Sequence, residues 1–396
     1  MSGDPINIRK RPPERIFGLS LDRTVEWATA LTDGTAGVNY DTIEKGTFQN
    51  VTLDPPRKVD FDLQEELAAA LEGLKDDPYF REKRIFEECG AVGVSTIGVV
   101  DPTNKRLIRI IMKELFPEAK GSVSKRVTDL KKRYLVDFKE LFGNQLHIET
   151  NLADSDRLSV RNDTTAAAVA EYFGQCEYSR KHHEGAELTK VVYLKFDEGV
   201  NGGIIVGPRP FEGRPVETER NVELGHSYPR LHWQDRDFRG VCPVHRTCYE
   251  GLASNRRLRE SWGGKTPRAD FTLVDLPENH PAWEIMAHYI AHLSYTALLV
   301  ASPERIILGG SVISGRDEAS RRKVHDHLFP RIWGNFERLI GDSLLSTFLP
   351  PHEPAENFIQ SGLVNEYTSL TGALLIAADS TKYAPRAVRK QKEGVT

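Results

Sequence analysis

Short apolar runs alternate with segments of helical periodicity along most of this chain, and few fold classes are compatible with that order. The pattern predicts strands at 91–100, 158–161, 191–196, 203–206 and 305–308, and helices at 63–74, 127–142, 164–173, 288–301 and 370–378. Three short runs near the start, at 16–21, 25–31 and 36–40, favour an antiparallel meander. Strands that alternate with helices are typical of α/β proteins, so we expect that class.

The composition excludes several classes of protein. The 396 residues carry a net charge of −4, which does not suit a nucleic-acid-binding surface, since that needs concentrated positive charge. No run approaches the ~18 apolar residues of a membrane span, and the first fifteen residues lack the apolar stretch of a signal peptide. We therefore expect a cytoplasmic protein without a nucleic-acid or membrane partner, in a compartment where thiols stay reduced.

The most specific cluster of chemistry-bearing residues is Cys242-Pro-Val-His245-Arg-Thr-Cys248, with His226 sixteen residues upstream of its first cysteine. Two thiolates and two imidazoles form a sound tetrahedral ligand set for zinc. Four protein ligands leave the metal no open position, so we expect a structural zinc that pins the loop between His226 and Cys248. His232 is an alternative fourth ligand, and a chance grouping of polar loop residues is the alternative to a metal site.

A second candidate site begins where the predicted strand 158–161 ends. There Asn162-Asp163 precedes a run of small residues that is typical of a helix. Ligands of α/β folds gather at the carboxyl ends of strands, where an Asp can accept a proton from a substrate hydroxyl. Asn and Asp are also preferred N-caps of helices, so this segment by itself allows either catalysis or capping.

Glycines follow strands at two further places. The sequence DEGVNGG at 197–203 separates two apolar strands, and Gly309-Gly310 directly follow the predicted strand 305–308. Glycine lets backbone N–H groups approach a phosphate or a nucleotide closely. Glycine turns between strands are also common for structural reasons alone, so each motif is weak by itself.

Taken together and in order, these segments resemble the ROK family of sugar kinases, transcriptional repressors and related proteins, and its bacterial fructokinase-like branch in particular. The matching segments are GVSTIGVVDP, RNDTTAAAVAE, GVNGGIIVG, ELGH, CPVHRTCYEGLAS, PERIILGG and LTGALLIA, which cover roughly residues 16–380. The combination of ELGH with CPVHRTCYEGLAS is the most specific part. The resemblance implies the actin-like ATPase fold, with two α/β lobes and a ligand cleft between them. It also implies phosphorylation of a sugar hydroxyl with ATP and Mg²⁺, and a homodimer.

The resemblance assigns roles to residues that match its motifs. Asp163 is the general base of that assignment, and Asn162, Glu223, His226 and Glu250 contact the sugar, with His226 also a zinc ligand. The glycines assigned to the nucleotide are Gly199, Gly202, Gly203, Gly309 and Gly310. Ionised carboxylates accept hydrogen bonds from the hydroxyl groups of a sugar, and one base is enough for the attacking hydroxyl.

Both phosphate-binding turns depart from the family pattern. In Ser20–Thr24, Ser20 replaces the acid of the family's turn, and Asp22 and Arg23 replace two glycines. The second turn, Asp197–Gly199, reads DEG instead of Gly-Thr-Gly, which sets two carboxylates near the expected triphosphate. Like charges ~4 Å apart repel by on the order of 1–4 kcal/mol. Mg²⁺ or Arg23 can offset this repulsion, so we count Arg23 among the nucleotide-binding residues.

The sequence thus predicts an ATP-dependent kinase of a sugar, aminosugar or cyclitol. A non-catalytic sugar-binding protein remains an alternative, as does an enzyme on this scaffold with another phosphate donor or reaction. The repressor branch is disfavoured, because only about fifteen residues precede the first predicted strand, where such repressors carry a helix-turn-helix domain.

The expected organisation is two lobes between two loose ends. We expect flexible tails at 1–14 and 383–396, a small α/β lobe at 15–125 and a large α/β lobe at 126–382. The segment 149–157, before the strand that leads to Asp163, is an apparent insertion.

Overall fold

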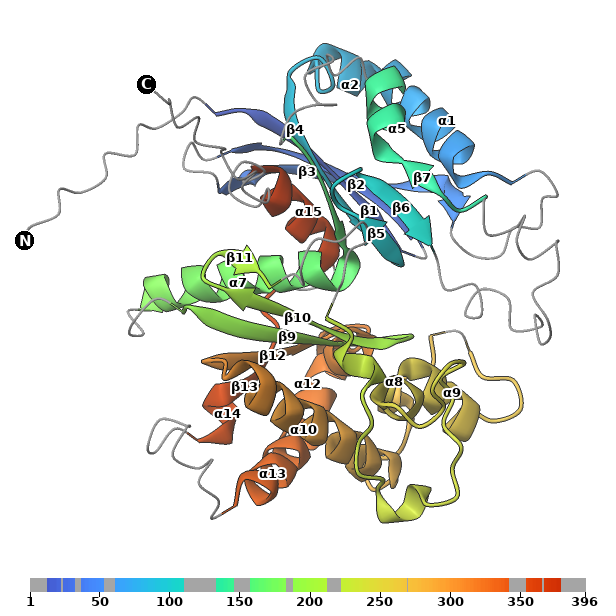
Figure 1. The fold of residues 1–396 in the computed structure, drawn as a ribbon, viewed down its shortest axis with the longest axis vertical. Coiled ribbons are helices and arrows are strands. Elements are labelled where there is room, and N and C mark those ends of the chain that lie inside the picture. The colour runs from blue at the N-terminus through green and yellow to red at the C-terminus, as the bar shows by residue number, and fades with distance from the viewer. Residues whose placement is uncertain are drawn as a thin grey trace, which may run out of the picture. The chain divides into compact units, whose positions relative to one another are not determined.

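The computed structural model describes residues 13–22, 24–32, 37–52, 61–109, 133–145, 157–182, 188–211, 222–268, 270–341, 354–364 and 367–378. These residues have the α/β character that the sequence predicts, and they form two compact units (Figure 1). Unit 1 contains the described residues up to 161 and those from 373 onward, and unit 2 contains those between 162 and 372. The segment 383–396, Arg23 and nearly all of 1–14 and 149–157 lie outside the described residues.

Unit 1 is built on a five-stranded sheet with the order β3-β2-β1-β4-β8. Its strands are β1 (Arg15–Leu21), β2 (Thr24–Thr32), β3 (Val38–Thr52), β4 (Cys89–Thr96) and β8 (Leu158–Asn162). The first three form the predicted antiparallel meander, and β4 runs parallel to β1. β8 completes this sheet, and the described residues 133–145 and 157–161 belong to unit 1, whereas the sequence pattern places the second lobe from 126 onward.

The helices of unit 1 are α1 (Leu63–Asp76), α2 (Pro78–Glu82) and α5 (Phe138–Gln145), and a second small sheet contains β5 (Val99–Asp101), β6 (Arg106–Arg109) and β7 (Val136–Asp137). The predicted helix at 127–142 is wrong at 136–137, which pair with β6 as a strand. The helix begins only at Phe138, because the Asp137 carboxylate accepts the backbone N–H groups of Lys139 and Glu140.

Unit 2 is built on a second five-stranded sheet with the order β11-β10-β9-β12-β13. Its strands are β9 (Lys190–Phe196), β10 (Val200–Val206), β11 (Arg209–Pro210), β12 (Arg305–Gly309) and β13 (Ile359–Ser361). The central strand β9 pairs antiparallel with β10 and parallel with β12. The carboxyl ends of β9 and β12 therefore lie at one edge of the sheet.

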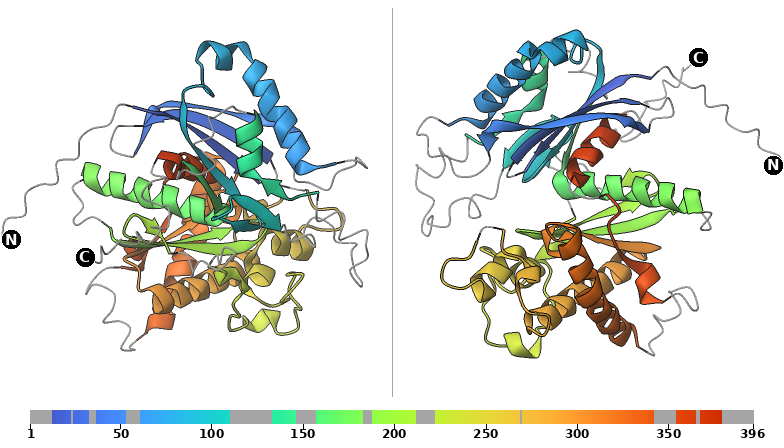
Figure 2. Two further views of the ribbon diagram at one scale, coloured as in Figure 1. Left: turned by 45° about the horizontal axis from the view of Figure 1, so that its top comes forward. Right: turned by 180° about the vertical axis from the view of Figure 1, so that it is seen from behind.

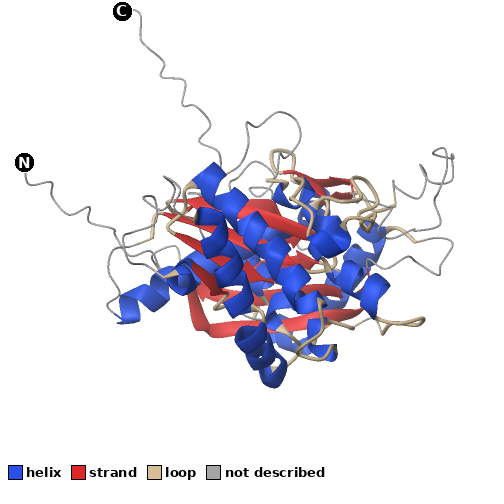
Figure 3. Cartoon of the chain, turned by 90° about the horizontal axis from the view of Figure 1, so that it is seen from below, coloured by secondary structure: helices blue, strands red, loops and turns tan. Residues whose placement is uncertain are grey.

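Helices cover both faces of this sheet. Helix α7 (Asp163–His182) lies over one face, and α10 (Ala282–Ala301) and α13 (Phe329–Ile340) lie on the other (Figures 1 and 2). Viewed from below, helices lie across the strands (Figure 3). Val192, Leu194 and Phe196 of β9 are buried in the core that contains α10 and α13. Each large apolar side chain buried there contributes about 1.5–3 kcal/mol.

The other helices of unit 2 are short and lie near the ends of these strands or along the core. They are α8 (Tyr249–Ala253), α9 (Asn255–Trp262), α11 (Ser311–Ser314), α12 (Glu318–His327) and α14 (Ala355–Phe358), and the last helix, α15 (Thr368–Ala378), begins in unit 2 and ends in unit 1. Within the described part of the chain, no helix has both the length and the apolar character needed to cross a membrane.

A buried ion pair joins the long loop before α8 to the helices α9 and α10. The Asp235 carboxylate accepts hydrogen bonds from the Arg257 guanidinium at 2.7 Å and from the Tyr289 hydroxyl at 2.8 Å. The Arg257 guanidinium also lies 3.3 Å from the ring centroid of Phe238. Since the Arg257 and Asp235 side chains are only 4% and 3% exposed, each charge depends on the other for compensation.

Replacing Asp235 with Ala should leave the Arg257 charge buried without its partner. We expect Asp235→Ala to lower the free energy of unfolding by roughly 3–5 kcal/mol. The control is Asp237→Ala, two residues along the same loop, where the side chain is exposed and the expected change is within about 0.5 kcal/mol. Equal urea midpoints for the two variants would contradict this role of the buried pair.

Candidate functional site

Asp163 is the first residue of α7, directly after β8 ends at Asn162. The Asn162 side chain accepts the backbone N–H of Thr164 at 3.0 Å, which is the capping contact that the sequence left open. The Asp163 carboxylate makes a different contact: its Oδ2 accepts a hydrogen bond from Lys195 Nζ at 2.8 Å. Capping is therefore the task of Asn162, and the Asp163 carboxylate faces the sheet of unit 2.

The expected sugar contact Glu223 lies against the next strand of the same sheet. Lys195 of β9 is paired in register with Asn201 of β10, so their side chains share one face. The Asn201 amide donates to Glu223 Oε2 at 3.4 Å. Asp163 thus contacts Lys195, Lys195 lies opposite Asn201 in the sheet, and Asn201 contacts Glu223.

Gly225 fixes the position of the ELGH segment on β10. A Cβ atom at this position would lie only 1.6 Å from the Val200 carbonyl oxygen, so any residue but glycine would displace the segment. His226, one residue further, ends a short 3-10 helix at Leu224–His226. Glu250 of α8 approaches from the other side, where its Oε2 lies 2.9 Å from a Cβ built on Gly199. The carboxylates that the resemblance assigns to a sugar thus lie around the β9–β10 turn.

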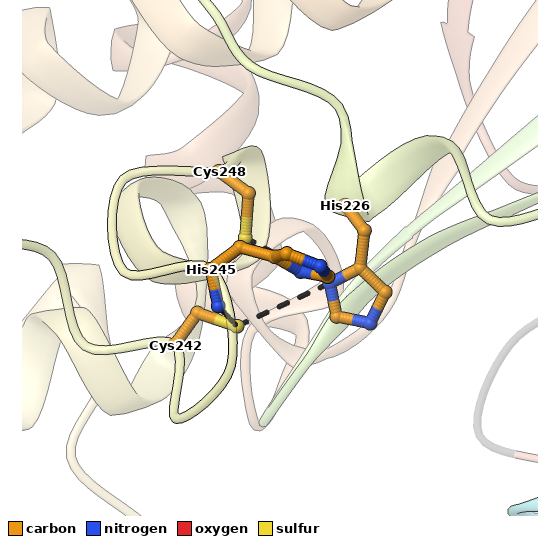
Figure 4. Close-up of side chains that lie close together, drawn as sticks. All are labelled: His226, Cys242, His245 and Cys248. Atoms are coloured by element: carbon orange, nitrogen blue, oxygen red, sulfur yellow. Dashed lines mark hydrogen bonds between the residues drawn. The ribbon is translucent and has the colours of Figure 1, made fainter.

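The two cysteines and two histidines of the predicted zinc site come together (Figure 4). One ligand atom from each of His226, Cys242, His245 and Cys248 lies within 4.8 Å of the others. His226 Nδ1 lies 4.0 Å from Cys242 Sγ and 3.8 Å from Cys248 Sγ. Ligands of a tetrahedral zinc are separated by about 3.3–3.8 Å, so small inward shifts would bring these atoms to bonding distance.

The chemistry of the cluster also fits a metal ion. His245 Nδ1 is buried and makes no hydrogen bond to any residue that the structure describes. A hydrogen bond from Cys248 lowers the pKa of the Cys242 thiol, and the hydrogen bond with Cys242 raises the pKa of His226. A buried thiol of lowered pKa and a buried imidazole nitrogen without a hydrogen bond among the described residues are groups that a divalent cation such as zinc would satisfy.

The structure separates the two candidates for the fourth ligand. His226 faces both sulfur atoms through Nδ1, and its other ring nitrogen points away from the cluster (Figure 4). His232 lies outside the group, because its Nδ1 accepts the backbone N–H of Gln234 and its ring packs against Trp233 and His288. The cluster is therefore the set that includes His226.

The two acids of the turn Asp197–Gly199 have partners within unit 2. The Arg259 guanidinium of α9 donates to both oxygens of the Glu198 carboxylate. Asp197 Oδ1 accepts the Ser311 hydroxyl at 2.5 Å, and the Asp197 carbonyl accepts the backbone N–H of Asn255 at 2.7 Å. A protein cation thus compensates the charge of Glu198, which the sequence left to Mg²⁺ or Arg23.

The glycines assigned to the nucleotide also have close neighbours within the protein. A Cβ on Gly309 would lie 2.2 Å from the Tyr193 hydroxyl, and one on Gly203 would lie 2.6 Å from Ala168 Cβ. Gly310 has φ of +87° and would meet the Phe196 carbonyl at 2.3 Å, and Gly202 would meet Leu224 at 2.9 Å. Packing alone therefore requires small residues there, whatever else they contact.

The first altered turn is described only in part. Ser20 is buried in β1, paired with Ser95 of the parallel strand β4, and Asp22 donates its backbone N–H to the Thr24 carbonyl at 3.1 Å. Arg23 lies outside the described residues. The structure thus places Ser20 one residue before the end of β1, but it does not test the expected role of Arg23.

Two residues at the site were not singled out by the sequence. Lys195 and Arg259 each pair with a carboxylate that the sequence did single out. A charged residue within the apolar strand 190–196 is a signal for Lys195, since such positions are rarely occupied by lysine without a partner. No such signal marks Arg259, which lies on a helix rich in arginine.

Comparison with known proteins assigns a family to this fold. The family model described as "ROK family" matches residues 58–344. The fructokinase of Zymomonas mobilis is 35% identical over 206 residues, which are 51% of this chain and 58% of that protein. A putative fructokinase of Bacillus subtilis is 30% identical over 195 residues, which are 48% of this chain and 56% of that protein. The chain thus spans somewhat more than half the length of these curated relatives.

Solved structures show the same fold. A ROK hexokinase from Thermus thermophilus is 21% identical with a TM-score of 0.55, and the match covers 93% of this chain and 99% of that one. A ROK glucokinase from Streptomyces griseus, solved with glucose and AMPPNP, is 18% identical with a TM-score of 0.54, and the match covers 92% of this chain and 99% of that one. The described residues thus have the actin-like ATPase fold that the resemblance implies. Because the family model covers more than half of its length, this chain belongs to the ROK family.

Proposed function

We propose that this protein phosphorylates a hydroxyl group of a sugar or sugar-like substrate with Mg²⁺ and ATP, with Asp163 as the general base. The observation that carries the proposal is the position of Asp163: its carboxylate is not used as a helix cap and lies beside a cation at the start of α7. Membership of a family with fructokinase and glucokinase members supports the choice of reaction.

The proposed transfer requires one base and an in-line donor. Asp163 accepts the proton of the attacking hydroxyl as its oxygen bonds to the γ-phosphorus of ATP. The bond from that phosphorus to the bridging oxygen breaks, and ADP leaves with the bonding electron pair. Since phosphoryl transfer depends chiefly on positioning and charge stabilisation, the fixed orientation of the Asp163 carboxylate is the main contribution of this side chain.

The proposed sugar contacts surround the β9–β10 turn. Glu223 and Glu250 would accept sugar hydroxyls, and Asn162 and the outward-pointing ring nitrogen of His226 would add further polar contacts. The substrate class is a hexose, an aminosugar or a cyclitol, because carboxylate acceptors suit any polyol of that size. We further propose that the protein acts in the cytoplasm, as its composition predicts, and that it is a homodimer, as the resemblance implies.

A structural zinc held by His226, Cys242, His245 and Cys248 is part of the proposal. When bound, it would join the ELGH segment to the loop that precedes α8 and leave no position open for a reacting group. His226 and Glu250 would then be held in fixed positions relative to one another. The metal would support the sugar site without taking part in the transfer.

A second candidate function is favoured by the acids of the turn Asp197–Gly199. The Arg259 guanidinium and the Ser311 hydroxyl already donate hydrogen bonds to Glu198 and Asp197. Neither donor is therefore ready to bind a phosphate group. The corresponding function is sugar binding without transfer from ATP, or transfer from another phosphate donor. A panel of hexoses, aminosugars and cyclitols with Mg-ATP, analysed by mass for a phosphorylated product, separates the two. A product with ATP supports the kinase, and sugar-induced thermal stabilisation without any effect of nucleotide supports the second function.

Asp163→Asn should remove the group that accepts the proton, while the side chain keeps its size and shape. We expect kcat to fall by roughly 10²- to 10⁴-fold. Sugar affinity by calorimetry should change by less than about threefold, because uniform binding is retained. The control is Asp237→Asn, an exposed residue of the same chemistry. A kcat within about threefold of the wild-type value would exclude Asp163 as the base.

Metal analysis tests the zinc site separately. We expect about one equivalent of zinc per chain in the purified protein and nearly none in His245→Ala, with a lower melting temperature in that variant. His325→Ala removes an exposed histidine and should keep the metal. Zinc below about half an equivalent in the wild-type protein, unchanged after zinc is added, would count against the site.

A further inference from the structure

The ion pair between Lys195 and Asp163 is the contact from which this inference starts. Nζ and Oδ2 lie 2.8 Å apart, and the two side chains are 15% and 12% exposed. Taking an ammonium group and a carboxylate out of water costs several kcal/mol per ion, and their attraction repays this only with good geometry. A buried ion pair of this kind adds little net stability to the fold. Its position at the proposed general base therefore indicates a role in the reaction.

The pleat of β9 places Lys195 where it is. Its neighbours Leu194 and Phe196 are fully buried in the core on the side of α10. Since successive side chains of a strand point to opposite faces, Lys195 points to the face covered by α7. The start of α7 brings Asp163 to the same face. Both partners are thus held by regular structure and not by loops.

The contact occupies only one of the two Asp163 oxygens. Oδ2 accepts from Lys195, whereas Oδ1 is 3.5 Å from the Thr164 hydroxyl, at the outer limit of a hydrogen bond. An anchored Oδ2 fixes the plane of the carboxylate and directs Oδ1 in one direction. A general base needs this, because the proton that it accepts must lie within about 2.6–3.2 Å.

The negative charges of the turn Asp197–Gly199 give a cation at position 195 a second role. Asp197 and Glu198 follow Lys195 by two and three residues, and they bring negative charge close to the expected phosphate. The Arg259 guanidinium donates to the Glu198 carboxylate, and Asp197 Oδ1 accepts hydrogen bonds from the Ser311 hydroxyl and from the backbone N–H of Glu198. The ammonium of Lys195 adds a positive charge on the strand that leads into this turn, beside the carboxylate proposed as the general base.

We propose that Lys195 is a positioning residue of the transfer reaction: it anchors Asp163 Oδ2 so that Oδ1 receives the proton of the sugar hydroxyl. This inference rests on the proposed function and adds a residue to it. A lysine serves here because its compact ammonium sits on a flexible stem and can approach a carboxylate oxygen end-on. The general base is then a pair of side chains that act together.

The test compares Lys195→Ala with Lys190→Ala, which removes a lysine at the other end of the same strand. We expect Lys195→Ala to lower kcat by about 10²-fold while KM for sugar and for ATP changes less than about threefold, since positioning acts on the transition state. Lys190→Ala should keep a kcat near the wild-type value. Methylammonium or ethylammonium added to Lys195→Ala should restore kcat in a saturable manner, and ethanol at the same concentration should not.

Each outcome of this test decides between a positioning role and its absence. A kcat of Lys195→Ala within about threefold of wild type would overturn the inference and leave the kinase proposal intact. A loss of kcat together with lost sugar affinity and no recovery with alkylammonium would show a merely structural role and would overturn it too.

A binding measurement covers the case in which no sugar is phosphorylated. Sugar affinity of Asp163→Asn, Lys195→Met and the double variant then forms a cycle that does not depend on turnover. Effects that fail to add support an Asp163–Lys195 unit that presents one oxygen to the sugar, and additive effects overturn it. If the wild-type protein neither transfers phosphate nor binds any sugar of the panel, both proposals fall together.

Discussion

The pairing of β9 with β10 on one side and β12 on the other is the constraint from which the rest of unit 2 follows. One face of β9 is sealed by Val192, Leu194 and Phe196 in the core beneath α10 and α13. The opposite face holds α7, so the only charged residue within the strand's buried run, Lys195, meets Asp163 at the start of that helix. Backbone pairing therefore decides which side chains share the candidate site, and the chemistry depends on a register that cannot slip without turning Lys195 into the core.

A second constraint acts on the loop that contains the cysteines. Gly225 lies against the Val200 carbonyl, and the buried Asp235–Arg257 pair joins the same loop to α9. Cys242 and Cys248 lie between Asp235 and Arg257 in the chain, and their sulfur atoms approach His226 Nδ1. Packing and a buried ion pair thus bring the ligand atoms together, and a metal ion would tighten a cluster whose backbone is already arranged.

The turn Asp197–Gly199 shows how tertiary contacts change the meaning of charged residues. In the sequence, two carboxylates near an expected triphosphate predict repulsion. In the fold, the Arg259 guanidinium donates to the Glu198 carboxylate and the Ser311 hydroxyl donates to the Asp197 carboxylate. These hydrogen bonds attach the turn to α9 and α11. The same contacts leave fewer hydrogen-bond donors for a phosphate group. They are therefore the observation that favours a phosphate donor other than ATP, or sugar binding alone.

The sequence by itself determined the α/β class, the opening meander, the helices predicted at 63–74 and 288–301, the family, and the set His226, Cys242, His245 and Cys248 with His232 as an alternative to His226. Those features depend on local periodicity, on capping and on motif spacing, which are readable along one chain. Only the tertiary structure decided that Asn162 caps α7 while Asp163 pairs with Lys195, that Arg259 compensates Glu198, that His232 stands apart, and that β8 joins the first sheet. Lys195 lies 32 residues from Asp163 and Arg259 lies 61 residues from Glu198. A contact between residues so far apart in the chain depends on how sheets and helices pack, which no local pattern encodes.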